Sequence, residues 1–138
     1  MIGVLLVTHG AIGETLLESA AQILNGRPEQ ADALGVSRIE DPELVLERAR
    51  KRIARLDKGQ GVLVLTDIFG ATPCNVVARL LVDGKVEGVS GVSLPMLLRV
   101  LSGRNGSPSG ELSGAVQRAL SGGAEGVVHV NRDSCRNA

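Results

Sequence analysis

Apolar residues gather in five short runs that alternate with polar and glycine-rich segments. The first run, MIGVLLVT, covers residues 1–8, and a similar run, GVLVLTD, covers residues 61–67. Continuous apolar runs of this length are typical of strands that are buried on both faces of a sheet. Weaker runs at 31–37, 86–94 and 124–130 are also predicted to be strands.

Between these runs the apolar positions recur at helical spacing. The segment after the first run follows an i, i+3, i+4, i+7 pattern and stops at Asn25–Gly26, a typical helix end. The segment 40–56 has Asp41 in the N-cap position and Pro42 at the first helical position. Further helices are predicted from a cap at Thr72 to about residue 81, from Pro95 to about residue 101, and over about 111–121.

Strands that alternate with helices favour one α/β domain. We expect a single open, mostly parallel sheet with strand order 2-1-3-4 and a C-terminal antiparallel strand, covered by helices on both faces. The domain is expected to span residues 1–130, with residues 131–138 as a flexible tail.

The composition excludes several classes of function. Phe69 is the one aromatic residue, so a base-stacking surface for nucleic acid is not expected. Fifteen basic and fifteen acidic side chains cancel, which argues against binding to DNA or to an anionic membrane. The chain shows neither a membrane span nor a secretory signal, and Cys74 and Cys135 have no metal-type spacing. A cytoplasmic protein with reduced thiols is therefore expected.

Two ionisable residues stand where strongly apolar runs end: His9 after the first, and Asp67 at the end of the run 61–67. In open α/β sheets the ligand crevice lies beyond the carboxyl ends of the strands, at the point where strand order reverses. If the two strands are neighbours, these side chains can meet. A carboxylate that accepts the Nδ1 proton leaves Nε2 of a neutral imidazole free to attack.

The segment FGATP at 69–73 supplies groups that an incoming phosphoryl group needs. Gly70 lets the backbone approach closely, and the amides at a helix start, with the Thr72 hydroxyl, favour an anion. The chain has neither a Walker lysine loop nor a metal-ligand cluster, so neither a cofactor nor a metal is expected. The sequence thus predicts a place to hold one phosphoryl group on a histidine.

The same stretches carry a family resemblance. The segments VTHGAIGETLLESA (7–20) and TDIFGATPCNVVARL (66–80) resemble the mannose-family IIA proteins of the bacterial phosphoenolpyruvate-dependent phosphotransferase system. That family shows a strand followed by T-H-G, and a D-x-x-G-[GA]-[ST]-P-x-N segment. GVSLPMLLRVL (91–101) is similar to the family's G-[VI]-N-[LI]-P-M-L, with Ser93 in place of the asparagine.

The resemblance implies that His9 is phosphorylated by the phosphocarrier protein HPr, with Asp67 as its hydrogen-bonding partner. Phosphate contacts are expected from residues beside these two, namely Thr8, Gly10, Gly70, Ala71 and Thr72. The group would pass to a IIB protein, expected in trans because the chain stops at residue 138. A membrane would be reached only indirectly, through a permease complex.

Family members are homodimers in which a C-terminal strand crosses to the partner's sheet. The resemblance therefore implies a homodimer, with AEGVVHV (124–130) as the crossing strand.

Two other function classes stay open. One is a stand-alone regulatory module, in which phosphorylation of His9 switches the binding of a partner. The other is a histidine phosphatase or mutase, whose active histidine also precedes a glycine. That class requires an arginine where Thr8 stands and a second catalytic histidine, whereas His129 lies in an apolar run. The sequence leaves the sugar and the acceptor protein open.

Overall fold

The computed structural model describes residues 1–104 and 111–132, and its sheet has the predicted strand order. Four parallel strands lie in the order β2-β1-β3-β4. The elements are β1 (Gly3–His9), α1 (Ile12–Leu24), β2 (Ala31–Val36), α2 (Pro42–Leu56), β3 (Val62–Thr66), α3 (Thr72–Ala78), β4 (Val86–Val89), α4 (Leu94–Gly103), α5 (Leu112–Glu125) and η2 (Val130–Arg132).

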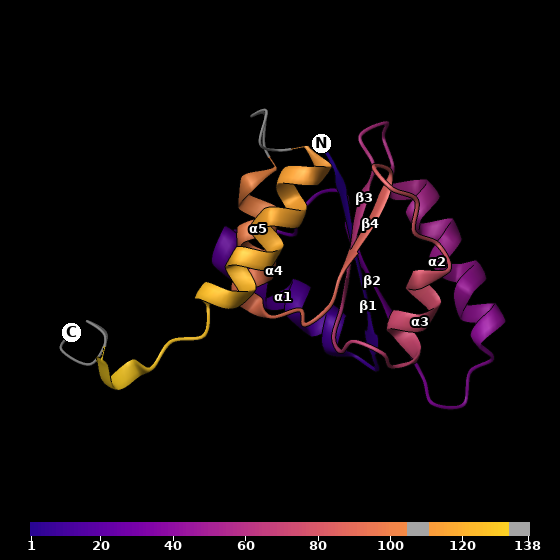
Figure 1. Ribbon diagram of the computed structural model, residues 1–138, viewed down its shortest axis with the longest axis horizontal. Coiled ribbons are helices and arrows are strands. Elements are labelled where there is room, and N and C mark those ends of the chain that lie inside the picture. Colours follow the sequence, from indigo (N-terminus) through magenta and orange to yellow (C-terminus); the bar gives the residue numbers. More distant parts are fainter. Residues whose placement is uncertain (105–110, 133–138) are drawn as a thin grey trace.

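The sheet is a central layer with helices on both faces, as predicted. Figure 1 shows it nearly edge-on, with α1, α4 and α5 on one side and α2 and α3 on the other. Alternate residues of β1 supply the two cores: Val4 and Leu6 pack with the first group of helices, and Leu5 and Val7 with the second. All four side chains are fully buried, which explains why the run reads as continuously apolar.

Three helix ends follow from the sequence signals. The Asp41 side chain accepts a hydrogen bond from the Glu43 amide at 2.9 Å and caps α2, as predicted. Asn25 adopts the left-handed conformation that closes α1, with φ of 59°. Ser93 accepts a hydrogen bond from the Met96 amide at 3.3 Å and caps α4. Serine and asparagine are both strong N-caps, so the departure at position 93 preserves the cap.

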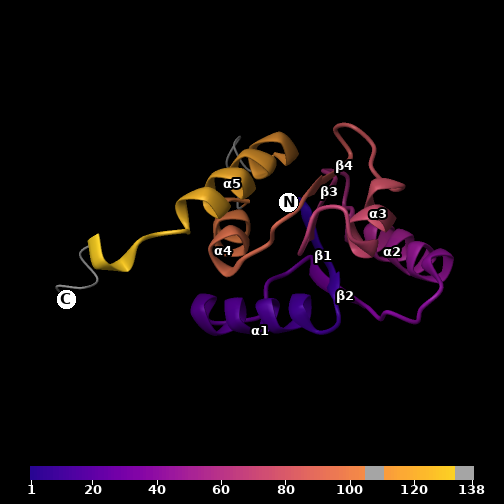
Figure 2. The same cartoon turned by 60° about the horizontal axis from the view of Figure 1, so that its bottom comes forward.

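The antiparallel strand predicted at 124–130 does not form. Helix α5 continues to Glu125, and residues 127–129 lead away from the domain before the short helix η2 (Figure 1, Figure 2). A strand needs a neighbour to satisfy its backbone groups, and the described part of this single chain places none beside the segment. Most of the predicted tail, 133–138 with Cys135, lies outside the described residues.

The fourth strand is shorter than the predicted 86–94, because the backbone leaves the sheet after Val89. Gly91 has φ of +80°, a turn conformation that favours glycine, and Ser93 then caps α4. Among the described residues, no helix combines the length and apolar character that crossing a bilayer requires.

Candidate functional site

The candidate site lies where the two central strands end. β1 and β3 are parallel neighbours, with Val7 opposite Thr66. His9 is the last residue of β1, and Asp67 directly follows the last residue of β3. Parallel strands bring their carboxyl ends to one edge of the sheet, so two residues far apart in sequence meet there.

The predicted contact between the two side chains is present. The Nδ1 atom of His9 lies 2.7 Å from Oδ2 of Asp67, and the backbone N–H of His9 donates to the same oxygen at 3.0 Å. The backbone N–H of Ile68 donates to Oδ1 at 3.1 Å. Three hydrogen bonds therefore fix the carboxylate, and the histidine contributes two of them.

The hydrogen bonds of the pair favour a charged carboxylate. Burial alone would raise the pKa of Asp67, but the hydrogen bonds from the backbone and ring of His9 outweigh it, so the pKa lies below its ordinary value. A carboxylate can only accept, so Nδ1 carries the ring proton. The His9 side chain is 46% exposed and that of Asp67 is 12% exposed. This arrangement leaves Nε2 as the nitrogen available to a ligand.

Thr8 supports the histidine from inside the fold. Its fully buried hydroxyl accepts a hydrogen bond from the Gly13 amide at 2.8 Å and donates to the His9 carbonyl at 3.3 Å. The side chain thus links the end of β1 to the first turn of α1. We assign Thr8 a positioning role, and these contacts do not support the predicted phosphate contact.

Replacing Thr8 by valine is expected to lower the free energy of unfolding by about 1–3 kcal/mol, because the buried Gly13 amide would lose its acceptor. Chemical denaturation followed by circular dichroism measures the change. The matched control is Thr72→Val, which removes an exposed hydroxyl and should alter the free energy by less than about 0.5 kcal/mol. Equal denaturation midpoints for the two variants would contradict the positioning role.

The predicted phosphate-binding residues divide into two groups. The Gly10 amide donates to the Val36 carbonyl at 3.0 Å, so this N–H already serves the fold. Gly70, Ala71 and Thr72 instead form the turn after Asp67, where the backbone passes through φ of +85° at residue 70. Amides at a helix start have no partner within the helix, so this turn offers donors beside the histidine.

The predicted cap of α3 is wrong by one residue. Ala71 occupies the N-cap position and Thr72 is the first helical residue, so the Thr72 hydroxyl is not the cap. Its side chain is exposed on the turn beside Asp67, where it can meet a ligand.

Sequence reasoning missed Asn75. Its side-chain amide donates to the Gly70 carbonyl at 3.2 Å, and its backbone N–H donates to the Ala71 carbonyl at 2.9 Å. Asn75 therefore holds the turn in shape from the first turn of α3. The signal was its place as the last residue of the D-x-x-G-[GA]-[ST]-P-x-N pattern.

Other candidate groups lie apart from this site. His129 is exposed and belongs to residues 127–129, the segment that leads away from the domain (Figure 1). In the described parts of the chain, no three His, Cys, Asp or Glu side chains gather closely enough to hold a metal ion.

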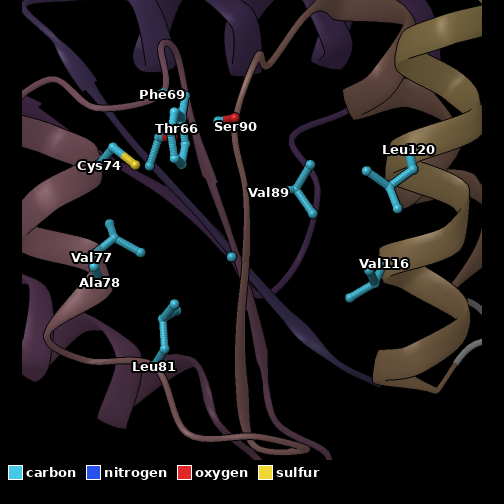
Figure 3. A pocket seen from close by; sticks show the side chains of 11 residues that line it. Thr66, Phe69, Cys74, Val77, Ala78, Leu81, Val89, Ser90, Val116 and Leu120 are labelled. Atoms are coloured by element: carbon cyan, nitrogen blue, oxygen red, sulfur yellow. The ribbon is translucent and has the colours of Figure 1, made fainter.

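A groove of about 390 Å³ runs beside β4. Figure 3 shows Cys74, Val77 and Leu81 on one wall, from α3 and the turn after it, and Val116 and Leu120 of α5 on the other. Phe69, from the turn after Asp67, lies at one end of the groove. The groove is therefore largely apolar and adjoins the histidine site.

Comparisons with known proteins agree with this geometry. The family model described as PTS system fructose IIA component (EIIA-man), where PTS is the phosphotransferase system, matches residues 3–117. The chain is 35% identical over 127 residues to the PTS system mannose-specific EIIAB component of Escherichia coli K12, covering 91% of this chain and 38% of that protein. It thus spans little more than a third of that relative's length.

Two shorter relatives are covered more fully. The chain is 33% identical over 103 residues to the PTS system fructose-specific EIIA component of Bacillus subtilis 168, covering 74% of this chain and 70% of that protein. The solved phosphotransferase system component EIIA from Streptococcus agalactiae shares the fold, with a TM-score of 0.83 at 24% identity over 96% of this chain and all of that one. The chain therefore belongs to the EIIA-man family of PTS IIA components.

Proposed function

We propose that this protein carries a phosphoryl group on His9, which it accepts from HPr and passes to a separate IIB protein in sugar uptake. The observation that carries the proposal is the 2.7 Å contact between the His9 ring and Asp67, in a chain of the EIIA-man family. Family membership alone supports phosphoryl transfer in general. The contact with Asp67 engages Nδ1 of His9 and so points to Nε2 as the atom that carries the phosphoryl group.

The step is a direct transfer between two imidazoles. The Nε2 lone pair of His9 attacks the phosphorus of a phosphohistidine on the donor, and a new P–N bond forms as the donor's P–N bond breaks. The donor nitrogen keeps the electron pair of the broken bond. His9 retains its Nδ1 proton and becomes positively charged, and the Asp67 carboxylate stabilises that charge. Transfer to a IIB protein is the same step in reverse.

The transferred group itself needs donors. The amides of Gly70, Ala71 and Thr72 and the Thr72 hydroxyl lie on the turn that begins after Asp67. Preorganised donors of this kind stabilise the charge that a transferring phosphoryl group develops. Asn75 keeps the turn in shape through its bond to the Gly70 carbonyl.

Intact-protein mass spectrometry tests the proposal. Incubation with phosphoenolpyruvate, enzyme I and HPr should add one acid-labile phosphoryl group per chain, and a IIB acceptor should then remove it. A mass that does not change in the complete reaction would overturn the proposed function.

We also propose that the protein is a homodimer joined through β4. The two edges of the sheet differ. On β2, the Asp32 carboxylate accepts the outward Ala33 amide at 2.8 Å and Arg52 donates to the Ala33 carbonyl, so side chains occupy that edge. Among the described residues β4 pairs with β3 and, at Val86 alone, with an isolated bridge to Val82, and it borders the apolar groove, so a further strand can add along the rest of β4.

The C-terminal segment has the right composition to supply that strand. Val127, Val128 and Val130 are exposed in the single chain, and residues 127–129 already run away from the domain. In the dimer that the family resemblance implies, this segment would lie along β4 of a second copy and cover its groove.

Deleting residues 127–138 is expected to weaken dimerisation by about 100-fold or more, because burying each valine contributes about 1.5 kcal/mol or more. The deletion leaves α5 whole, since this helix ends at Glu125. Light scattering over a concentration series measures the change. A truncated protein that dimerises as well as the full chain would contradict the exchanged strand.

A further inference from the structure

Helix α2 borders a hollow of about 280 Å³, and every residue that lines it is basic. The four residues are Arg48, Lys51, Arg52 and Arg55. We call this feature the basic hollow. The acidic and basic side chains of the whole chain cancel, so this concentration of positive charge is local to one face of α2.

The spacing of the four cations makes them repel one another. Their positions in α2 follow i, i+3, i+4 and i+7, which places them on one face of the helix. Arg48 and Arg52 are four residues apart, and so are Lys51 and Arg55. Like charges at this spacing destabilise a helix. The arrangement therefore costs stability in the protein alone, and a bound polyanion would remove that cost.

Two carboxylates hold the arginines in place without neutralising the hollow. Oδ2 of Asp32 lies 3.8 Å from Nη2 of Arg55 and 3.9 Å from Nε of Arg52, and both distances are longer than a hydrogen bond. Arg48 binds the Glu40 side chain. Neither carboxylate lines the hollow. Most of the guanidinium donors of Arg55 therefore stay available to a ligand.

Lys51 and Arg55 are the most accessible of the four cations. Lys51 is exposed and forms no ion pair within residues 1–104 and 111–132, the described parts of the chain. The Arg55 side chain is 69% exposed. Asp32, their nearest acidic neighbour, belongs to β2, the sheet edge opposite β4. A dimer joined through β4 would leave this face of α2 open to a ligand.

We propose that the basic hollow binds a short chain of linked phosphates, either free or attached to a small organic molecule. Guanidinium groups bind phosphate oxygens in pairs, and a concave surface of one charge concentrates its field on a bound anion. Seven helical steps separate the first cation from the last, a length of about 10 Å, which suits several linked anionic groups better than one.

Two features of the basic hollow favour phosphates over other anions. Its volume is that of a small-molecule site and is too small for an acidic helix of a partner protein. It is lined by no aromatic side chain, so a nucleobase would find no stacking surface there. The site is independent of the proposed carrier function, because it shares no residue with the histidine site.

Titration calorimetry of the full chain with inorganic tripolyphosphate, at about 0.15 M salt, tests the site. Lys51→Gln and Arg55→Gln should each weaken binding by about tenfold, because each removes a charge-assisted contact. The matched control is Arg50→Gln. Arg50 lies on the same helix, pairs with Glu47 at 3.6 Å and does not line the hollow, so its loss should change the affinity by less than about twofold.

A second measurement separates a binding role from a structural one. Lys51→Gln should leave the free energy of unfolding unchanged or raise it, because it removes a cation from a repelling set. Chemical denaturation measures this. A variant that loses stability together with binding would show that the lysine serves the fold, and would overturn its role in the site.

Further probes identify the ligand. Orthophosphate should bind at least about tenfold more weakly than tripolyphosphate, because it reaches fewer of the cations. ATP should bind as tightly as tripolyphosphate, and an affinity more than about tenfold higher would overturn a site that recognises phosphates alone. Hexaglutamate that binds as tightly as tripolyphosphate would make the hollow a contact for acidic proteins instead.

The remaining outcomes separate this site from the carrier function. Equal affinities of the wild-type protein and both hollow variants for tripolyphosphate would overturn the proposal, as would no binding at all, and His9 labelling by HPr would be unaffected in either case. Labelling by HPr should be the same in the wild-type protein and in both variants. A loss of labelling in the variants would make the hollow part of the carrier surface and would overturn an independent site.

Discussion

His9→Gln is expected to abolish phosphorylation by HPr, reducing the incorporated phosphoryl group from one per chain to background. Glutamine has a polar side chain of similar reach but no nucleophilic ring nitrogen, so it cannot form the P–N bond. The His9 side chain is half-exposed, so its replacement should leave the fold intact. Intact-protein mass spectrometry measures the incorporation.

The chain offers a matched control, because it contains only two histidines. His129→Gln should be labelled as fully as the wild-type protein. A label that survives in His9→Gln, or that disappears in His129→Gln, would show that a residue other than His9 carries the phosphoryl group.

Asp67→Asn is expected to slow transfer by about 10²-fold. This is the lower end of the range of rate losses seen when a group that positions a proton and stabilises charge is removed. An asparagine oxygen can still accept the Nδ1 proton but cannot neutralise the positive ring of phosphorylated His9. Rapid-quench kinetics measures the rate. Asp83→Asn, which removes an exposed carboxylate elsewhere, should leave it unchanged. Equal rates for the two variants would remove Asp67 from the mechanism.

The same carboxylate makes a pH-dependent contribution to stability. Hydrogen bonds from His9 hold its pKa below the ordinary value of 3.8, so the folded state favours the charged form. A group of this kind stabilises the fold above its unfolded pKa, and the contribution is lost as the pH falls through the folded pKa. The stability difference between wild type and Asp67→Asn should be constant near neutral pH and should fall away below about pH 4.

The contact between His9 and Asp67 could be predicted from the sequence because it depends on topology. His9 and Asp67 each follow a strongly apolar run, and the order of strands and helices favours a parallel sheet. In such a sheet, strand ends that are 58 positions apart in sequence become neighbours, so the contact could be anticipated without coordinates.

What could not be predicted depends on side-chain direction and on partners outside the chain. Thr8 precedes the histidine, and only the pleat of β1 shows that its hydroxyl faces α1 and binds the Gly13 amide. Valine-rich residues 124–130 have a strand-like composition, but a strand forms only beside another strand, and the described part of one chain provides none there. Residues 124 and 125 instead extend α5.

The most direct test of the account is to identify which ring nitrogen of His9 carries the phosphorus. The Nδ1 atom is occupied by its hydrogen bond to Asp67, so the phosphoryl group should be attached to Nε2. Long-range proton–nitrogen correlation NMR of the ¹⁵N-labelled, phosphorylated protein distinguishes the two isomers. A spectrum of Nε2-phosphohistidine at His9 is the predicted result, and a spectrum of Nδ1-phosphohistidine would contradict the role given to Asp67.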